Sequence, residues 1–210
     1  MRFSLSLLVL IIILPILVIL AYLFTPSSAV WQHLYDTVLG TYVTQSAILM
    51  VGVGFGSLVL GITSAWLTTL CDFPLRRFFT WSLLLPMAIP AYIIAYTYTG
   101  FLDFAGPVQT VLRELFNWSY GDYWFPEVRS LTGAVIMLSL VLYPYVYLLA
   151  RSAFLSQADS VLEASQSLGL SPWQSFKRVS LPLARPAIIA GLSLVMMETL
   201  ADFGTVQYFG

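Results

Sequence analysis

The stretch SLTGAVIMLSLVLYPYVYLLA, residues 130–150, carries no charge and lies between Arg129 and Arg151. A helix rises about 1.5 Å per residue, so about 20 apolar residues cross the hydrocarbon core of a bilayer, which is about 30 Å thick. The stretch is therefore predicted to be a membrane-spanning helix. Further predominantly apolar runs of comparable length lie at about 4–24, 44–70, 78–101 and 187–208.

The composition supports a membrane protein. Hydrophobic residues make up 59% of the chain and charged residues 9%, with a mean hydropathy of +0.87. An ordinary soluble domain has about 25% charged residues. Lys177 is the only lysine, so the chain lacks the clustered basic face that nucleic-acid binding requires. We predict an all-α polytopic membrane helical bundle of about five spans, in a single transmembrane domain over residues 1–210.

The first apolar run has two interpretations. Arg2 and the small residues Ser27, Ser28 and Ala29 fit the n-region and cleavage site of a signal peptide. The hydrophobic region of a signal peptide is about 7 to 15 residues long, whereas residues 5–24 are apolar almost throughout. We therefore favour a retained membrane anchor.

The basic residues predict the orientation, because they concentrate in cytoplasmic loops. A cytoplasmic N-terminus leaves only Arg113 and Arg129 outside, in a multi-pass protein of the cell (inner) membrane. The basic residues then placed in the cytoplasm are Arg2, Arg76, Arg77, Arg151, Lys177, Arg178 and Arg185.

Helix-breaking residues interrupt several predicted spans, and a broken backbone is tolerated in lipid only where other helices or a water-filled cavity satisfy it. Pro86 and Pro90 are four residues apart, which places them on one face of the third span if that span is one helix. They are either structural kinks or part of a translocation path. Gly52 and Gly56 in the second span are predicted to allow close helix packing.

The segment 151–185, between the fourth and fifth runs, is too polar to insert. It is predicted to form two short cytoplasmic helices. Asp159 or Ser160 caps the first helix and Gly169 ends it; Ser171 caps the second helix, which has Pro172 at its first position. Pro182 is expected to stop the second helix. Such paired amphipathic helices lie either in the lipid interface or against a soluble partner.

The same segment resembles the EAA loop of the permeases of binding-protein-dependent ABC importers. That loop has the pattern E-A-A-x3-G-x9-I-x-L-P, and the spacing matches throughout, with Ser165 for the second alanine and Val179 for the isoleucine. The matching positions are Glu163, Ala164, Ser165, Gly169, Val179, Leu181 and Pro182. The resemblance implies that the loop docks into a cleft on a cytoplasmic ABC ATPase dimer. It also implies that Glu163 faces basic groups of the ATPase and that Gly169 forms the turn.

Other stretches resemble the ferric-iron permeases, in which two such halves are usually fused. They are residues 86–96, 103–109, 142–147 and 198–210. The resemblance implies import of ferric iron, an extracytoplasmic solute-binding protein as a partner, and a second permease half, fused or separate. Permeases for thiamine, sulfate or polyamines share much of this architecture and remain alternatives. On this comparison the chain is an incomplete permease, an N-terminal half or fragment.

Two acids interrupt the fifth run. Glu198 and Asp202 are four residues apart, so on one continuous helix their carboxylates share a face beside Gly204. Ionisable groups within a span are functional candidates, so the three residues are candidates for an outer gate or cation path. The alternative is a solvated helix end. Pro86, Pro90, Tyr92 and Tyr96 complete the candidate translocation path.

We predict that the chain is not an enzyme and that it has no cofactor-binding or metal site. The chain has no G-x-x-x-x-G-K-[ST] phosphate-binding loop, so ATP hydrolysis is expected in a separate ATPase subunit. An ion-gradient transporter or channel would also use broken spans and intramembrane acids, but it leaves the EAA spacing unexplained. A membrane scaffold without transport activity would explain the spans, but it would explain neither the acids in the fifth run nor the EAA spacing.

Overall fold

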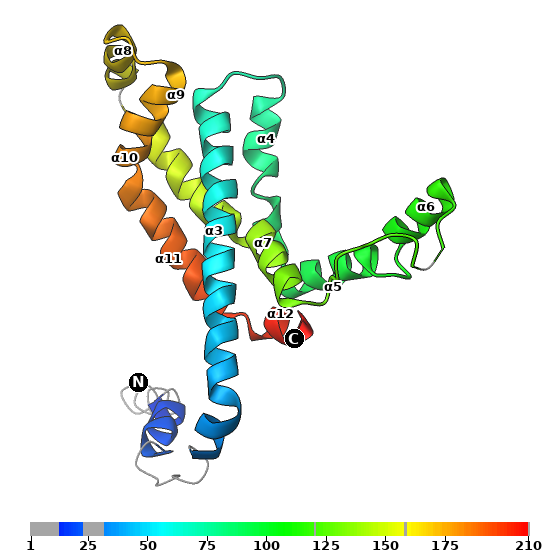
Figure 1. The fold of residues 1–210 in the computed structure, drawn as a ribbon. Helices are drawn as coiled ribbons and strands as arrows, with labels where there is room; N and C mark the ends of the chain where they lie inside the picture. Colours follow the sequence, from blue (N-terminus) through cyan, green and yellow to red (C-terminus); the bar gives the residue numbers. More distant parts are fainter. Residues whose placement is uncertain (1–12, 23–31, 120, 158, 210) are drawn as a thin grey trace, which may run out of the picture. The chain divides into compact units, whose positions relative to one another are not determined.

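The computed structural model describes residues 13–22, 32–119, 121–157 and 159–209 (Figure 1). The chain divides into two units, residues 1–44 and 45–210, which we treat separately. All regular structure in the described residues is helical. The prediction of an all-α membrane bundle is confirmed.

The first unit contains the apolar helix Ile13–Tyr22. This helix covers part of the first predicted span, and the remainder of 4–24 lies outside the described residues. Ser27, Ser28 and Ala29 lie outside them as well. A π-helical turn, η1 (Tyr35–Leu39), leads directly into α3 (Gly40–Leu70).

Two helices in the described part of the chain are long and apolar enough to cross a membrane by themselves. They are Leu39–Leu70, which contains α3, and α7 (Leu131–Leu155). α7 runs through Pro144 without interruption. Two helix pairs qualify as spans only if each bent pair is counted as one, with bends of 99° and 68°.

The first bent pair contains the third predicted span. Its elements are α4 (Arg76–Ser82), η2 (Leu85–Ala88), α5 (Ala91–Leu102) and α6 (Pro107–Phe116). Between η2 and α5, Ile89 adopts an extended conformation with φ −120° and ψ 130°. Pro86 and Pro90 therefore do not share one face of a continuous helix, and that expectation is wrong. A residue before proline is pushed out of the helical region, which explains where the break falls.

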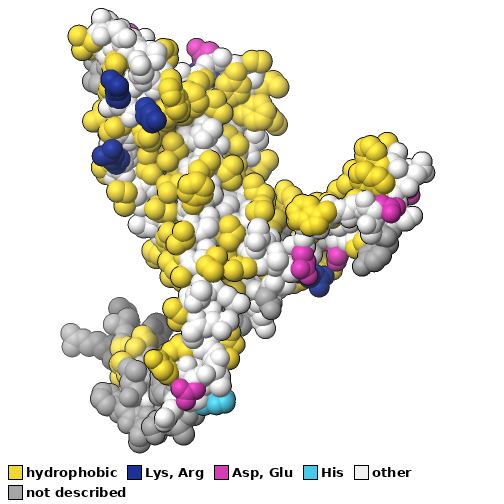
Figure 2. Space-filling model, viewed as in Figure 1, with side chains coloured by type: hydrophobic (Ala, Val, Ile, Leu, Met, Phe, Trp, Pro, Cys, Tyr) yellow, Lys and Arg dark blue, Asp and Glu magenta, His cyan; other side chains and the backbone are white. Residues whose placement is uncertain are grey.

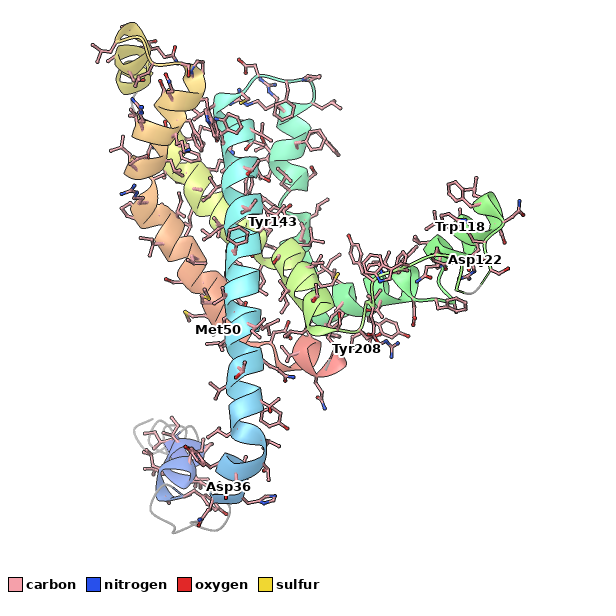
Figure 3. All side chains as sticks on the ribbon, viewed as in Figure 1. Asp36, Met50, Trp118, Asp122, Tyr143 and Tyr208 are labelled. Carbon is pink, nitrogen blue, oxygen red and sulfur yellow. The ribbon has the colours of Figure 1, made fainter. Side chains whose placement is uncertain are left out.

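Two tyrosines of α7 satisfy carbonyl groups that the turns between α4 and η2 leave without helical partners. In an α-helix each N–H donates to the carbonyl four residues earlier, but here Leu84 N–H donates to Trp81 O and Met87 N–H donates to Leu84 O. The carbonyls of Thr80 and Leu83 therefore lose their usual donors. Tyr147 Oη donates to Thr80 O at 3.1 Å, and Tyr143 Oη donates to Leu83 O at 2.8 Å (Figure 3). The hydroxyls supply hydrogen bonds that lipid cannot provide.

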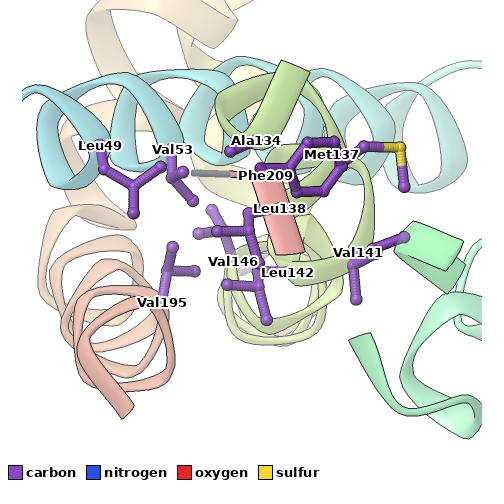
Figure 4. Close-up of a cluster of buried hydrophobic side chains, with 11 residues drawn as sticks. Leu49, Val53, Ala134, Met137, Leu138, Val141, Leu142, Val146, Val195 and Phe209 are labelled. Carbon is purple, nitrogen blue, oxygen red and sulfur yellow. The ribbon is translucent and has the colours of Figure 1, made fainter. Parts of the chain in front are cut away.

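α3 and α7 pack closely through small residues. A Cβ atom on Gly52 would lie 2.8 Å from the side chain of Val135, and one on Gly56 would lie against Ser139. The predicted use of this glycine pair is confirmed. Figure 4 shows the buried hydrophobic cluster beside this contact, which includes Leu49, Val53, Ala134, Met137, Leu138, Val141, Leu142, Val146, Val195 and Phe209.

The fifth predicted span is not one continuous helix. α11 (Arg185–Ala201) ends at Asp202, whose ψ of 73° breaks the helix, and α12 (Phe203–Phe209) follows. The expectation that Glu198 and Asp202 share a face of one continuous helix is therefore wrong. α11 packs along α7, and α12 packs against α5 and α7.

Many large apolar side chains of the second unit are exposed. On the visible face they cover much of the helices (Figure 2). Val51, Phe55 and Trp81 have exposed fractions of 69%, 70% and 74%. Exposed apolar surface of this extent marks a membrane or protein contact, and here it lies on helices with the hydropathy of membrane spans.

Candidate functional site

We call the segment 151–185, which resembles the EAA loop, the coupling loop. Its first helix, α8 (Asp159–Ser167), ends in a Schellman motif. Leu170 N–H donates to Ser165 O at 3.2 Å, and Gly169 N–H donates to Gln166 O at 2.9 Å. Gly169 has φ +89°, a conformation that glycine adopts without a Cβ clash. The prediction that Gly169 forms the turn is confirmed. The side chains of Asp159 and Ser160 lie outside the described part, so the cap predicted there stays a prediction.

Ser171 caps the second helix, as predicted, and Gln174 completes a capping box with it. Ser171 Oγ accepts from Gln174 N–H, and Gln174 Oε1 accepts from Ser171 N–H. Helical backbone then continues through α9 (Pro172–Ser175), η3 (Phe176–Ser180) and α10 (Leu181–Leu183).

Pro182 does not stop this helix where predicted. Leu181 N–H bonds Phe176 O five residues earlier, and this π turn shifts the pairing just before the proline. The chain turns at Ala184, and the bend to Arg185–Ala201 is 68°.

One face of the loop is buried. Ser165 Oγ donates to Ser175 Oγ at 2.8 Å, which joins α8 to α9. Phe176 is buried, with ring centroids 5.2 Å from Trp66 of α3 and 5.7 Å from Phe154 of α7. The loop is therefore packed on two of the long helices.

A hydrogen bond reinforces this attachment. Gln157 Nε2, just after α7, donates to Ser180 O at 2.9 Å. Trp173 adds an edge contact to Trp66, with ring centroids 5.3 Å apart. Sequence reasoning did not identify Trp66, Phe154 or Gln157 as parts of this site, because nothing in an apolar span indicates which aromatic residue faces the loop.

The other face of the loop is open. Glu163, Ala164 and Gly169 are exposed, and Leu168 has an exposed fraction of 85%. Val179, Leu181 and Pro182 are half-buried at the end nearer α11. Lys and Arg side chains gather over α9 to α11 on the visible face (Figure 2), where Lys177, Arg178 and Arg185 are exposed. An exposed leucine beside a carboxylate and basic groups suits a protein partner.

Part of the candidate translocation path comes together where α5 meets α12. A Cβ atom on Gly204 would lie 3.9 Å from Tyr92 Cβ and 3.9 Å from Asp202 Oδ1. The rings of Tyr96 and Tyr208 meet edge to face, with centroids 6.0 Å apart. Tyr92 and Tyr96 are exposed.

The two acids differ in their surroundings. Both carboxylate oxygens of Asp202 accept hydrogen bonds from Thr205, from the backbone N–H at 3.0 Å and from Oγ1 at 2.6 Å. Asp202 is thus the N-terminal cap of α12. Glu198 is exposed, and its Oε1 accepts a bond from Tyr145 of α7 at 3.4 Å. Pro86 lies apart from this group, in η2, which packs on α7.

The chain is similar in sequence to a known protein family and to several transport permeases. The model of the family "Binding-protein-dependent transport system inner membrane component" matches residues 57–210. The molybdenum transport system permease protein ModB of Haemophilus influenzae is 32% identical over 154 residues, which cover 73% of this chain and 64% of that protein. The sulfate transport system permease protein CysW of Escherichia coli is 31% identical over 156 residues, 72% of this chain and 49% of that protein.

A second ModB, from Escherichia coli, is 28% identical over 153 residues, 73% of this chain and 64% of that protein. The matched part thus covers between about half and two thirds of these relatives. The family match includes the whole coupling loop and all the helices of the second unit except the first part of α3. The chain belongs to the family of binding-protein-dependent ABC importer permeases.

Proposed function

We propose that the chain is a membrane subunit of an ATP-driven importer for a tetrahedral oxyanion such as sulfate or molybdate. One observation carries the coupling part of this proposal. The segment from Glu163 to Pro182 has one face packed on α3 and α7 and an opposite face that is exposed. Such a two-faced element suits the transfer of force from a soluble partner to membrane helices.

The buried face supplies a stiff connection. Phe176 is inserted between Trp66 and Phe154, so a displacement of the loop moves rings on both α3 and α7. Aromatic pairs of this kind contribute about 0.5–1.5 kcal/mol beyond their buried area. The bond from Gln157 to Ser180 ties the end of α7 to the same segment. Closely packed elements transmit shifts rather than absorb them.

The exposed face suits an ATPase cleft. Leu168 and Ala164 offer an apolar contact, and Glu163 offers a carboxylate to basic groups of the partner. The lipid interface, the other place considered for these helices, fits less well. Glu163 is exposed near the exposed Leu168, and a carboxylate is repelled by the anionic headgroups of the cytoplasmic leaflet.

The names of the relatives favour an oxyanion over ferric iron as cargo. The three relatives are named for molybdenum and sulfate transport. The sulfate alternative therefore has more support than the ferric-iron interpretation. Asp202 has a structural use as the cap of α12, so its presence in the fifth predicted span is explained without a cation as cargo.

The complete transporter would hold further subunits. We propose a cytoplasmic ABC ATPase dimer, an extracytoplasmic solute-binding protein and a second permease half. The distribution of basic residues supports an inner-membrane protein with a cytoplasmic N-terminus. In this orientation the coupling loop faces the ATPase, while the group of Tyr92, Tyr96 and Gly204 lies toward the outer side as a candidate gate.

Uptake into proteoliposomes tests this function. Vesicles containing the chain, its second permease half, its ATPase and its binding protein receive radiolabelled sulfate, molybdate or ferric citrate in separate assays. We expect ATP-dependent uptake of one or both oxyanions, no uptake of iron, and no effect of a protonophore. Iron uptake alone would contradict the cargo proposal, and uptake that a protonophore abolishes would contradict the ATP-driven mechanism.

A further inference from the structure

A second site lies at the end of the bundle where α3 ends and α4 begins. A cavity of about 590 Å³ opens there between α3, α4 and α7. Its lining includes Arg76, Arg77 and Arg151, and the lining residues, all within the described part of the chain, include no Asp or Glu. A hollow with three arginines and no lining carboxylate attracts anions.

Arg76 is held firmly at one side of the cavity. Its Nε donates to Thr68 O at 2.7 Å and its Nη2 donates to Thr69 O at 2.6 Å, which caps the end of α3. Its Nη1 pairs with Asp72 at 2.6 Å, and the side chain of Asp72 is 98% exposed. Water screens such an exposed carboxylate, so it neutralises the guanidinium only in part.

Arg151 lies at the other side, near the end of α7. Its Nε atom is buried and has no hydrogen-bond partner among the described residues. A buried donor of a charged group without a partner is destabilising. Arg77 beside Arg76 is exposed and adds a further positive charge. The cavity is thus lined by guanidinium groups, which form charge-assisted hydrogen bonds with phosphate.

The rim of the cavity is apolar and faces outward. Trp81 lines it with an exposed fraction of 74%, and Leu148 lines it with 40%. Leu75 and Phe78, next to the lining arginines in sequence, are 70% and 63% exposed. Exposed tryptophan beside arginine is typical of the level of lipid headgroups, where the ring contacts acyl chains and the cation contacts phosphate.

We propose that this cavity binds the phosphate of an anionic lipid headgroup, such as that of phosphatidylglycerol, on the cytoplasmic leaflet. The phosphate contacts Arg151 and Arg77, while Trp81 lies along the acyl chains. Basic pockets between membrane helices are known to bind such headgroups. The rim favours a lipid over a free oxyanion, because a soluble anion gains nothing from the exposed apolar residues. The site does not depend on which cargo the importer carries.

The cavity is close to the coupling loop through shared helices. Arg151 lies three residues before Phe154, which contacts Phe176 of the loop. Tyr147, which also lines the cavity, bonds Thr80 O across to α4. A lipid bound here would join α4 to α7 at the level where the loop is attached, and we expect it to stabilise that end of the bundle.

Thermal unfolding of the full chain in neutral detergent, with added lipid, tests the proposal. Phosphatidylglycerol should raise the melting temperature of the wild type, and phosphatidylcholine should not. Arg151→Gln and Arg77→Gln should each weaken the apparent affinity for phosphatidylglycerol about fivefold, the effect of removing one interfacial cation. Arg185→Gln, which removes an exposed arginine outside the cavity, should leave the affinity unchanged.

Two results would overturn the assignment. If sodium phosphate alone protected the wild type as well as phosphatidylglycerol, the site would bind a soluble anion. If Arg185→Gln weakened lipid binding as much as Arg77→Gln did, the effect would come from net charge and not from the cavity. Arg77 is exposed, so Arg77→Gln keeps the test valid even if Arg151→Gln fails to fold.

Discussion

The hydroxyl of Tyr143 on α7 donates a hydrogen bond to the carbonyl of Leu83 at 2.8 Å, across the break that follows α4. Tyr147, one turn further on the same helix face, does the same for Thr80. The broken span is therefore held by side chains of a neighbouring helix at the two carbonyls that lost their helical donors.

Tyr143→Phe should lower the free energy of unfolding by about 1–3 kcal/mol, because a half-buried carbonyl loses its donor in an apolar environment. Thermal unfolding in detergent, followed by tryptophan fluorescence, measures the change. Tyr145→Phe is the matched control, since within the described part of the chain its hydroxyl makes one bond, at 3.4 Å, to exposed Glu198. An equal loss of unfolding free energy in the two variants would show that the bond to Leu83 stabilises the protein no more than the bond to Glu198 does.

Gly191→Ala should destabilise the protein by about 1–3 kcal/mol, the usual effect of overpacking. A Cβ at this position would lie 2.9 Å from Val146 Cα, and backbone cannot move aside as a side chain does. Gly100→Ala provides the control, because a Cβ there meets nothing within 4 Å. In that variant the better helix propensity of alanine should leave stability unchanged or raise it. Similar melting temperatures for both variants would contradict the close approach of α11 to α7.

Asp202→Ala should cost about 0.5–2 kcal/mol of stability through loss of the cap of α12. Thr205→Val removes the 2.6 Å side-chain bond from the other partner. If Asp202 acts as a cap, the double variant should lose clearly less than the sum of the two single variants. Asp202→Asn should retain most of the stability, because an amide oxygen also accepts the Thr205 N–H. An Asn variant as unstable as the Ala variant would argue that the charge matters instead.

Phe176→Ala should separate ATPase binding from transport. The ring connects the loop to Trp66 and Phe154, whereas the exposed docking face does not include it. Co-purification with the ATPase should persist while ATP-driven uptake falls at least tenfold. Phe101→Ala, at a position 52% exposed, controls for loss of an aromatic ring and should transport normally. Normal uptake in Phe176→Ala would contradict the proposal that this ring transmits movement of the loop to α3 and α7.

The helix ends in the coupling loop could be predicted because their signals are local. Gly169 provides the left-handed turn by itself, and Ser171 with Pro172 starts the next helix from side-chain chemistry within one turn. Pro182 was misjudged because its effect depends on the π turn before it, which no short pattern indicates. The prolines at positions 86 and 90 predicted a break, but its size and its repair by Tyr143 depend on tertiary packing.

The candidate gate was harder to predict than the loop. The hydropathy of residues 187–208 predicts one span interrupted by two acids. In the structure a separate helix begins after Asp202, whose carboxylate accepts two hydrogen bonds from Thr205. The resemblance to the EAA loop predicted that the coupling loop docks on an ATPase. It did not predict which residues of the membrane helices contact the buried face of the loop. Trp66 is about 110 residues from Phe176 in sequence, and only the packing of α3 on α7 brings the two rings to 5.2 Å.

Cross-linking at Leu168 tests the docking of the loop most directly. The chain has one cysteine, Cys71, so Leu168→Cys in a Cys71→Ser background places a single thiol at a position that is 85% exposed. Trp124→Cys in the same background puts an equally exposed thiol, at 86%, in the segment predicted to face outside. We predict that a short thiol-to-amine cross-linker joins the ATPase to the chain at Leu168→Cys only, and that Gly169→Asp in that variant, which strains the turn, reduces the product. Equal cross-linking at both positions, or none at Leu168→Cys in a complex that imports its cargo, would contradict the account.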